Sequence, residues 1–365
     1  MNILVIPNRG RSYNAVRPEA ECYISLAKKG HQVTIITCTT NAYYDNYKNT
    51  DNINLIELKS LKKYSWQVIK QIHQHIKQHN IEIVYATESN GIPNAAFACI
   101  GTKAKMIAYR GTTGGMYKTD PSNYLCTLHP RINGYIGVSN AVTKNVKDKV
   151  RAGIKAFSRT IYKGHDLSWY QDKPIELTSL DNKLSQSKFN ILCIGSPRPY
   201  KGMHYMLDAM KALTDIEDVN LILVGDNFDC EPFSSQIQAT GMSEHIIQTG
   251  FRSDVPQIAA SCDVLVLPSE REGLPRVVLE SLASGTPVIT SANEGAMEII
   301  EQDVNGYIVP IGDSLAIAEQ IRYLYNQPEE RKRLADGAIN TIKTKMSHQE
   351  TVKNMAEFFE TVLNK

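Results

Sequence analysis

Two cations follow what reads as a buried strand in the second half of the chain. The stretch Gly195-Ser196-Pro197-Arg198-Pro199-Tyr200-Lys201-Gly202 comes directly after the apolar run Phe189–Ile194 and precedes a helical segment. A glycine at a strand end permits a sharp turn and close approach of a ligand to the backbone. Arg198 and Lys201 would neutralise a diphosphate at the carboxyl end of a sheet, where open α/β sheets bind ligands. The alternative interpretation is a solvated basic turn.

Two glutamates flank a predicted helix start in a second stretch, which follows the run Asp263–Leu267. Glu272 stands just before the predicted helix Pro275–Ser284 and Glu280 within it. The turn from Gly273 to Val277 would direct free backbone N–H groups at a phosphate. Carboxylates accept hydrogen bonds from sugar or ribose hydroxyls. For isolated glutamates the alternative is a helix-dipole partner exposed to water.

The first half carries weaker signals of the same kind. Arg110 and Gly111 follow the apolar run Met106–Tyr109, and a glycine-rich turn with an arginine can bind an anionic acceptor or a leaving phosphate. A loop without a ligand is the alternative. Asn8, Arg9 and Gly10 follow the first apolar run and should face the same edge. They lack the G-x-G-x-x-G pattern, which argues against a nicotinamide cofactor.

Length and strand pattern set the fold. At 365 residues the chain exceeds the roughly 250–300 residues at which single cores stop growing. Runs that are apolar throughout are typical of strands buried on both faces of a parallel sheet. Helix-like segments separate them, as at Pro18–Lys29. The sequence predicts an α/β protein with two doubly wound domains. The nine expected strands are Ile3–Ile6, Val33–Thr37, Ile81–Ala86, Met106–Tyr109, Tyr135–Val138, Phe189–Ile194, Val219–Val224, Asp263–Leu267 and Pro287–Thr290.

The domain boundary is expected in the polar stretch that precedes Phe189. We predict an N-terminal acceptor-binding domain over residues 1–165, a linker over 166–188 and a donor-binding domain over 189–345. Residues 346–365 would form a helix that packs back on the first domain. The opening MNILVIPNRG reads as a buried strand rather than a signal peptide. The seven cysteines form no CxxC pair and are expected to be buried free thiols in a reducing compartment.

The net charge of +2 conceals an asymmetry. Residues 1–170 hold 23 Lys and Arg against 10 Asp and Glu, and the rest of the chain holds 17 against 28. The basic half is expected to meet an anion, such as a membrane surface, a lipid phosphate or a polyanionic glycan. Leu61–His79 is a basic amphipathic candidate for lipid contact, or a helix that buries its isoleucines on the sheet. No recognisable module predicts nucleic-acid binding, and His129 reads as a surface residue.

Residues 189–310 resemble the donor-binding domain of the retaining glycosyltransferases of family 4, which have the two-domain B-type fold with a cleft between the domains. The resemblance rests on the Gly195–Gly202 stretch, on GFRSDVPQIAASCDVLVLPS at 250–269 and on EGLPRVVLE at 272–280. ASGTPVI at 283–289 and NGYIVPIGD at 305–313 extend it. The first half is similar at 18–37 and 161–170 and departs from the family at 38–80 and 110–133.

The resemblance implies roles for individual residues. Lys201 and Arg198 would contact the donor diphosphate, Glu280 the nucleotide ribose and Glu272 the transferred sugar. Ser196 stands where relatives usually carry an arginine, and Arg110 where they commonly carry a histidine. The implied catalytic residues are Glu272, Lys201 and Arg198, and the implied donor site comprises Gly195, Ser196, Arg198, Lys201, Phe251, Arg252, Glu272, Gly273, Leu274, Pro275, Val277 and Glu280. The acceptor or cleft residues would be Asn8, Arg9, Gly10, Arg110 and Gly111.

The expected activity is therefore retaining transfer of a hexosyl or related sugar to a glycan or lipid-linked acceptor, in bacterial polysaccharide or lipopolysaccharide synthesis. The co-substrate would be a nucleotide-diphosphate sugar, with UDP favoured over GDP, and neither a cofactor nor a metal ion is expected. We expect a cytoplasmic protein that contacts the inner face of the membrane peripherally. Two alternatives stay open, namely a non-catalytic nucleotide-sugar-binding scaffold and a sugar-nucleotide epimerase of similar fold.

Overall fold

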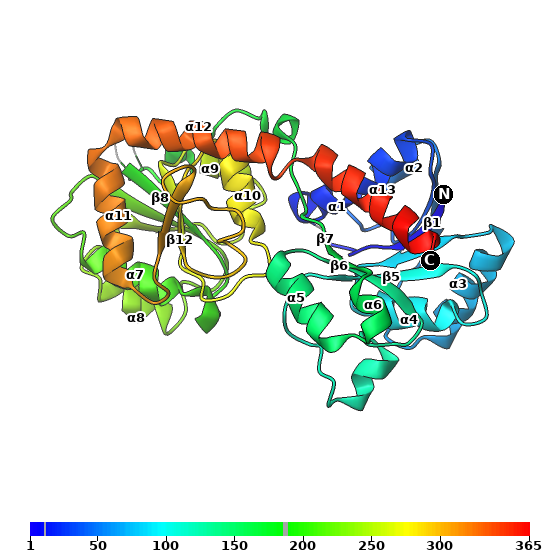
Figure 1. Ribbon diagram of the computed structural model, residues 1–365. Coiled ribbons are helices and arrows are strands. Elements are labelled where there is room, and N and C mark those ends of the chain that lie inside the picture. Colours follow the sequence, from blue (N-terminus) through cyan, green and yellow to red (C-terminus); the bar gives the residue numbers. More distant parts are fainter. Residues whose placement is uncertain (11, 185–188) are drawn as a thin grey trace. The chain divides into compact units, whose positions relative to one another are not determined.

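The computed structural model describes residues 1–10, 12–184 and 189–365. It divides into two compact units, Met1–Gly164 with His348–Lys365 and His165–Ser347 (Figure 1). The division at Gly164/His165 assigns most of the predicted linker to the second unit. Its last residues, 185–188, lie outside the described residues. The chain passes from the second unit back to the first between Ser347 and His348.

The first unit contains a parallel sheet whose strands run in the order β3-β2-β1-β4-β5-β6-β7. Its described strands are β1 (Asn2–Ile6), β2 (Gln32–Thr37), β3 (Ile53–Glu57), β4 (Ile83–Ala86), β5 (Lys105–Arg110), β6 (Ile132–Gly137) and β7 (Ser158–Thr160). Its described helices are α1 (Tyr13–Lys28), α2 (Tyr44–Lys48), α3 (Trp66–Gln78), α4 (Gly91–Ala98), α5 (Asn140–Lys149), α6 (Ala152–Lys155), α13 (His348–Leu363) and the 3-10 helix η1 (Pro121–Leu125).

Both faces of this sheet are covered. Leu4 and Ile6 of β1 belong to an apolar cluster shared with α3 and α4, whereas Ile3 and Val5 belong to a second cluster shared with α1 and α13. Successive side chains of a strand point to opposite faces, so one apolar strand supplies both clusters. The isoleucines of α3 are buried in the first cluster, and Trp66 at the start of that helix is 77% exposed. The α3 stripe is therefore core packing, not a lipid-contacting face.

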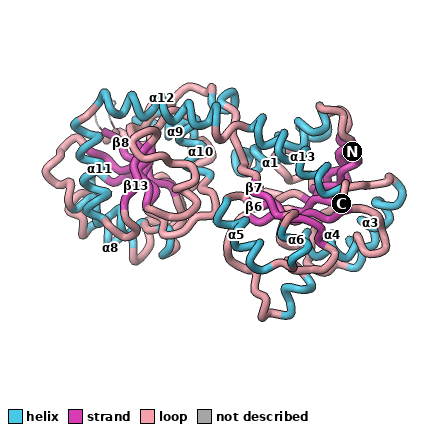
Figure 2. Tube along the Cα trace, in the orientation of Figure 1, coloured by secondary structure: helices cyan, strands magenta, loops and turns pink. Residues whose placement is uncertain are grey.

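The second unit contains a parallel sheet in the order β10-β9-β8-β11-β12-β13. Figure 2 shows its strands enclosed between helices, and the helices α7, α8 and α11 lie on the opposite side of the sheet from α9 and α10 in Figure 1. Its described strands are β8 (Phe189–Ile194), β9 (Val219–Val224), β10 (Ile246–Gln248), β11 (Val264–Leu267), β12 (Val288–Ser291) and β13 (Gly306–Val309). Its described helices are α7 (Met203–Lys211), α8 (Phe233–Gln238), α9 (Val255–Ala260), α10 (Arg276–Ala283), α11 (Ser314–Asn326), α12 (Pro328–Thr344) and the 3-10 helices η2 (Leu167–Tyr170), η3 (Leu177–Ser179), η4 (Pro199–Lys201) and η5 (Ser243–His245).

The two parallel sheets with alternating helices confirm the predicted fold class. Four short strands were not predicted: β3, β7, β10 and β13. Strand β3 is half-exposed and lies at the sheet edge, so it lacks the continuous apolar run that marked the others. Helix α1 begins at Tyr13 rather than Pro18, because the Ser12 carbonyl accepts hydrogen bonds from the amides of Ala15 and Val16.

Two expectations about single residues were wrong or need refinement. His129 is 6% exposed and packs its ring against Phe97, with 4.7 Å between the ring centres, so it is not a surface residue. All seven cysteines are free, as expected, but Cys230 is exposed rather than buried. Over the described residues, no helix combines the length and apolar character needed to cross a membrane.

Candidate active site

The carboxyl edge of the second unit's sheet brings together the two stretches that the sequence singled out. Strands β8 and β11 are hydrogen-bonded neighbours, and the order reverses between them, with β9 and β10 on one side and β12 and β13 on the other. Such a reversal is where doubly wound sheets bind ligands. Residues 195–202 follow β8 and residues 268–275 follow β11, so both loops leave the sheet at this point.

A glycine lets the two loops approach closely. Gly202 has a φ of +69°, in the left-handed region, and a Cβ at this position would lie 2.1 Å from the Pro268 carbonyl oxygen. Any other residue would therefore push the loops apart. The Glu270 amide also donates to the Tyr200 carbonyl, at 2.9 Å. The backbone thus fixes the position of Lys201 relative to the loop that follows β11.

Lys201 and Glu272 meet directly. The Lys201 Nζ atom lies 2.8 Å from Glu272 Oε1, and the two side chains are 24% and 14% exposed. They come from different strands and are 71 residues apart in sequence. The pair holds a cation and a carboxylate side by side at the edge of the sheet, half-buried and still within reach of a ligand.

Three cations surround Tyr200. The Arg198 side chain is exposed and its Nη1 donates to the Tyr200 hydroxyl at 2.9 Å. The Arg271 guanidinium lies 4.8 Å and the Lys201 ammonium 5.9 Å from the centre of the Tyr200 ring. Three positive charges within reach of one ring create a strongly anion-attracting surface. Arg271 was not singled out from the sequence, although it lies inside the predicted loop.

Glu280 is buried and incompletely partnered. It lies one helical turn into α10, is 2% exposed, and its Oε1 is 3.0 Å from the Arg276 Nε in an ion pair. That oxygen makes no hydrogen bond to any described residue. Burial raises the pKa of the Glu280 carboxyl to about 7, although the charge of Arg276 opposes the rise. No described ion pair or hydrogen bond joins this carboxylate to Lys201 or Glu272.

The loop before α10 supplies free donors. Pro275 is the N-cap of the helix, which begins at Arg276, one residue later than predicted, and Gly285 follows its end with a φ of +77°. The amides of Gly273 and Leu274 donate no hydrogen bond to another described residue. Val277 lies in the first turn, where helix N–H groups lack an intrahelical acceptor. These donors add to the positive field of the three cations.

Asn293 supports this loop and was missed at the sequence level. It is 1% exposed, its amide nitrogen donates to the Ser269 carbonyl at 3.1 Å, and its Oδ1 accepts from the Ala296 amide at 2.9 Å. A Cβ on Gly295 would lie 2.6 Å from the Glu272 carbonyl oxygen. The only available signal was that Asn293 follows the predicted strand Pro287–Thr290, at the same edge.

The remaining predicted donor residues are less directly connected. Gly195 donates to the Val224 carbonyl at 3.0 Å, and the Ser196 carbonyl accepts from the Arg198 amide at 2.7 Å. Phe251 is 66% exposed and its amide donates to Asp226 Oδ1 at 3.0 Å, which leaves the ring available for stacking. Arg252 is instead held by Asp254 through two contacts of 2.9 and 2.6 Å.

The first unit has a different carboxyl edge. The Asn8 amide donates to Thr87 Oγ1 at 3.1 Å, and the Arg9 Nε lies 3.0 Å from Glu88 Oε2. The Gly10 carbonyl accepts from the Ala42 amide at 3.4 Å. Strands β1, β4 and β5 are parallel neighbours in this order, so their carboxyl ends lie at one edge of the sheet. Residues 8–10 after β1 therefore share that edge with Arg110 and Gly111 at the end of β5. No described hydrogen bond or ion pair connects Arg9 with Arg110.

Arg110 folds back on its own loop. Its Nη2 donates to the Gly114 carbonyl, while its buried Nε has no hydrogen-bond partner among the described residues. A Cβ on Gly111 would lie 3.3 Å from the Tyr109 ring, so a side chain there would require a small adjustment. Arg110 is thus a half-satisfied cation at the end of β5.

A buried network beneath this edge was not anticipated. Glu19, 7% exposed, accepts from the Tyr23 hydroxyl at 2.7 Å and from Thr87, and pairs with Lys163. Burial alone would raise the pKa of Glu19, but the charge and hydrogen bond of Lys163 lower it overall. Lys163 also lies 4.3 Å from the Tyr109 ring centre. In the described part of the chain, no cluster of three or more His, Cys, Asp or Glu side chains could hold a metal ion.

Family comparisons decide the class. The model for glycosyl transferases group 1 matches residues 177–341, and the model for glycosyl transferase 4-like proteins matches residues 3–135. Together they cover both units. The chain belongs to the group 1 glycosyltransferases. The resemblance predicted from the sequence is therefore confirmed.

Individual relatives agree with this assignment. The glycosyltransferase is 28% identical over 232 residues to the putative glycosyltransferase EpsD of Bacillus subtilis, which is 61% of each chain. It is 31% identical over 149 residues to the lipopolysaccharide core biosynthesis glycosyltransferase LpsE of Rhizobium meliloti, covering 41% of this chain and 43% of that one.

A solved structure extends the likeness to the whole fold. The crystal structure of Anabaena HepE in complex with UDP superposes with a TM-score of 0.80 at 20% identity, covering 99% of this glycosyltransferase and 100% of HepE. At this identity the likeness concerns the fold alone. With the two parallel sheets, it assigns the chain to the B-type glycosyltransferase fold with two Rossmann-like domains.

Proposed function

We propose that this glycosyltransferase transfers a sugar from a UDP-sugar to a glycan or lipid-linked acceptor with retention of configuration and without a metal ion. The carrying observation is the meeting of Lys201 and Glu272, 2.8 Å apart, at the strand-order reversal of the second unit, where Arg198 and Arg271 contact the adjacent Tyr200. The lipopolysaccharide core biosynthesis function of LpsE and the UDP bound to HepE support a surface-polysaccharide or lipopolysaccharide acceptor and a uridine donor.

The diphosphate is the expected partner of the cations. Lys201 and Arg198 contact its oxygens, and Arg271 adds a third charge from the neighbouring loop. These charges stabilise the negative charge that develops as UDP leaves, the task that a metal ion performs in other enzymes. The free amides of Gly273 and Leu274 are donors for the same group.

The carboxylates hold the groups attached to the diphosphate. Glu272 accepts from hydroxyls of the transferred sugar once Lys201 turns to the phosphate, and Glu280 accepts from the ribose hydroxyls. A ribose hydroxyl would also supply the hydrogen bond that Glu280 Oε1 lacks. A buried oxygen without a hydrogen bond is unfavourable in the ligand-free protein, so a ribose hydroxyl that donates to Glu280 Oε1 would favour nucleotide binding.

The transfer step needs no covalent nucleophile. The bond from the anomeric carbon to the UDP oxygen breaks, and the acceptor hydroxyl forms its bond on the same face. The acceptor proton passes to the leaving phosphate. The side chains position the donor and stabilise charge.

The test is a donor screen followed by product analysis. Purified protein is incubated with UDP- and GDP-sugars and with extracted lipid-linked glycans, and nucleotide release and product anomers are measured. We expect release of UDP and a product with the donor's anomeric configuration, undiminished by a chelator. An inverted product, or a requirement for added metal, would overturn the proposed mechanism. Binding without any turnover would instead indicate a scaffold.

A further inference from the structure

A pocket of about 490 Å³ lies in the first unit, apart from the carboxyl edge. Its walls come from the segment 118–132, the start of β6 and the end of α5 with the following α6. Since β6 begins at Ile132, this is the amino end of that strand, opposite the edge where Arg110 ends β5. The volume is within the range of ligand pockets. No role described so far uses it.

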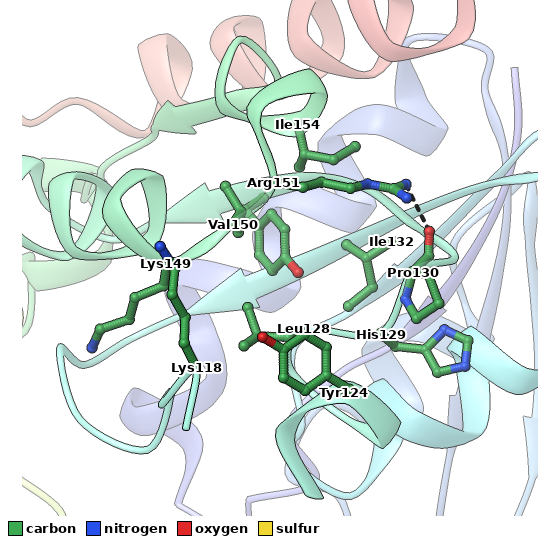
Figure 3. Close-up of a pocket in the computed structure, with 11 residues that line it drawn as sticks. Lys118, Tyr124, Leu128, His129, Pro130, Ile132, Lys149, Val150, Arg151 and Ile154 are labelled. Atoms are coloured by element: carbon green, nitrogen blue, oxygen red, sulfur yellow. Dashed lines mark hydrogen bonds between the residues drawn. The ribbon is translucent and has the colours of Figure 1, made fainter. Parts of the chain in front are cut away.

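The interior of the pocket is apolar. Leu128 and Ile132 form one side, and Val150 and Ile154 face them, as Figure 3 shows. The Tyr135 hydroxyl donates to the Thr127 carbonyl at 2.7 Å, so the polar tip of this side chain is already used. Aliphatic walls of this kind favour an aliphatic ligand, because each buried methylene contributes about 0.8 kcal/mol.

The rim is cationic. Lys118 and Lys149 lie at one end of the pocket in Figure 3 and Arg151 lies at the other, while none of the lining residues is acidic. Arg151 donates to the Pro130 carbonyl at 2.7 Å and Lys149 to Asn145 Oδ1 at 2.9 Å. Lys118 makes no hydrogen bond or ion pair to another described residue. Two ammonium groups at one end match a phosphate in charge.

Apolar surface continues outside the pocket. Tyr117, Tyr124 and Leu125 are 54%, 47% and 52% exposed; Tyr124 and Leu125 belong to the segment that forms one wall, and Tyr117 directly precedes it. The Lys149 ammonium lies 5.5 Å from the Tyr117 ring centre, so the exposed rings and the cations are neighbours. A ligand that is apolar over more than the pocket's own length would cover these side chains; a compact anion would not.

We propose that this pocket binds the lipid phosphate of a lipid-linked acceptor, with the chain among Leu128, Ile132, Val150 and Ile154 and the phosphate at Lys118 and Lys149. This proposal rests on the proposed function, since it identifies the acceptor as lipid-linked. Lys118 comes eight residues after Arg110 in the chain, a span of at most about 29 Å when extended. A glycan carried by the same lipid can therefore reach the carboxyl edge while its lipid stays in the pocket.

The first experiment measures binding of farnesyl phosphate to the full-length protein by isothermal titration calorimetry. Farnesol, inorganic phosphate and 1-naphthyl phosphate are compared with it. We expect each of the three to bind at least about tenfold more weakly than farnesyl phosphate. Farnesol lacks the anion, inorganic phosphate lacks the chain, and 1-naphthyl phosphate has a planar ring system in place of a flexible aliphatic chain. Equal binding of inorganic phosphate or of farnesol would overturn the proposal. Equal or tighter binding of 1-naphthyl phosphate would replace the lipid with a planar ligand.

The second experiment locates the site. Lys118→Glu with Lys149→Glu, and separately Leu128→Trp, should each weaken farnesyl phosphate binding at least about tenfold. Lys147→Glu is the matched control, since Lys147 is exposed on the same helix and does not line the pocket. Unchanged binding in both pocket variants, or an equal loss in the control, would overturn the proposal.

A third measurement separates this proposal from the donor assignment. The thermal shift caused by UDP should be the same in the pocket variants and in the wild type, which also shows that they are folded. Loss of farnesyl phosphate binding with intact UDP binding supports the pocket. If the wild type binds farnesyl phosphate but turns over no nucleotide sugar, the proposed function fails and the pocket stands. If it turns over donor but binds no farnesyl phosphate, only the pocket proposal fails.

Discussion

The carboxyl edges of the two sheets carry similar side chains and use them differently. In the first unit, Arg9 pairs with Glu88 and Lys163 with Glu19, so both cations are neutralised by the fold itself. In the second unit, three cations surround Tyr200, and among the residues that the structure describes only Lys201 of the three has a carboxylate, Glu272, within 4 Å. The first edge is mostly internally satisfied, with the buried Arg110 Nε as its exception, and the second edge keeps several positive charges and free amides for an anion.

The difference shows that charge at a strand end does not by itself indicate a ligand site. What distinguishes the second edge is that two neighbouring cations, Arg198 and Arg271, have no carboxylate within 4 Å among the described residues. Buried or crowded charges are costly unless they are paired, so unpaired ones that persist in a fold point to a missing partner. The following substitutions test this contrast.

The largest effect is expected where the fold pairs its own charges. Lys163→Met should lower the free energy of unfolding by about 3–5 kcal/mol, because it leaves the buried Glu19 carboxylate uncompensated. The measurement is the denaturant midpoint of the first unit, followed by amide hydrogen exchange of β1 and β4. Lys70→Met, at an exposed position of α3, is the control. An unchanged midpoint in Lys163→Met would show that the pair is not structural.

The same pair predicts a pH dependence. The pKa of Glu19 is lowered in the folded protein, so its contribution to stability is present above the unfolded value and is lost as pH falls through the folded one. Wild type should lose this part of its stability on acidification, and Glu19→Gln with Lys163→Met should not. Parallel acid unfolding curves for the two proteins would contradict this.

The next effect concerns catalysis at the open edge. Lys201→Met should reduce turnover about 10²–10³-fold, as expected for loss of one group that stabilises charge in the transition state. Stability should change little by comparison, because the cation is partly exposed. Steady-state nucleotide release is the readout, and Lys211→Met, in an exposed pair with Asp208, is the control. Near-normal turnover of Lys201→Met would refute the leaving-group role.

A third effect follows from Glu280. Its folded pKa of about 7 is above the ordinary value of 4.5, so the unfolded chain loses this proton first as pH rises and stability falls between about pH 4.5 and 7. Glu280→Gln removes that cost and should be more stable than wild type at pH 8 by at most about 3 kcal/mol, with the gap closing at pH 5. Thermal unfolding at the two pH values measures it. An equal difference at both would contradict the buried carboxylate.

The smallest effect tests the support of the loop. Asn293→Ala removes three hydrogen bonds, to the Ser269 and Ser291 carbonyls and from the Ala296 amide, and should cost about 1–2 kcal/mol of stability with a severalfold rise in the donor KM. Asn326→Ala, at the exposed end of α11, should change stability by less than about 0.5 kcal/mol. Identical donor kinetics in wild type and Asn293→Ala would show that the loop needs no such support.

The sequence predicted the second unit well because its chemistry is local. The Gly195–Gly202 stretch and the Glu272–Glu280 stretch each contain their own turn glycines, cations and helix start, so strand neighbours alone bring Lys201 to Glu272. Strand β3, half-exposed at its sheet edge, carried no comparable pattern. The roles of the predicted site residues stay predictions that ligand binding will test.

The interactions that escaped prediction are long-range. Glu19 and Lys163 are 144 residues apart, and nothing in either neighbourhood signals the other. Asn293 acts on a loop 24 residues earlier, and Arg271 acquires its place only because Tyr200 comes from another strand. The domain boundaries predicted at 165 and 188 also remain a prediction, since the second lies beside the undescribed residues 185–188.

The central claim is that the open edge of the second unit holds the donor diphosphate, and UDP binding tests it most directly. At 100 times its dissociation constant, UDP should stabilise the wild type by about 2.7 kcal/mol in thermal unfolding. We expect Lys201→Met to lose most of that shift and Arg9→Gln, at the self-paired edge of the first unit, to retain it. A UDP shift that survives Lys201→Met and disappears in Arg9→Gln would contradict the account.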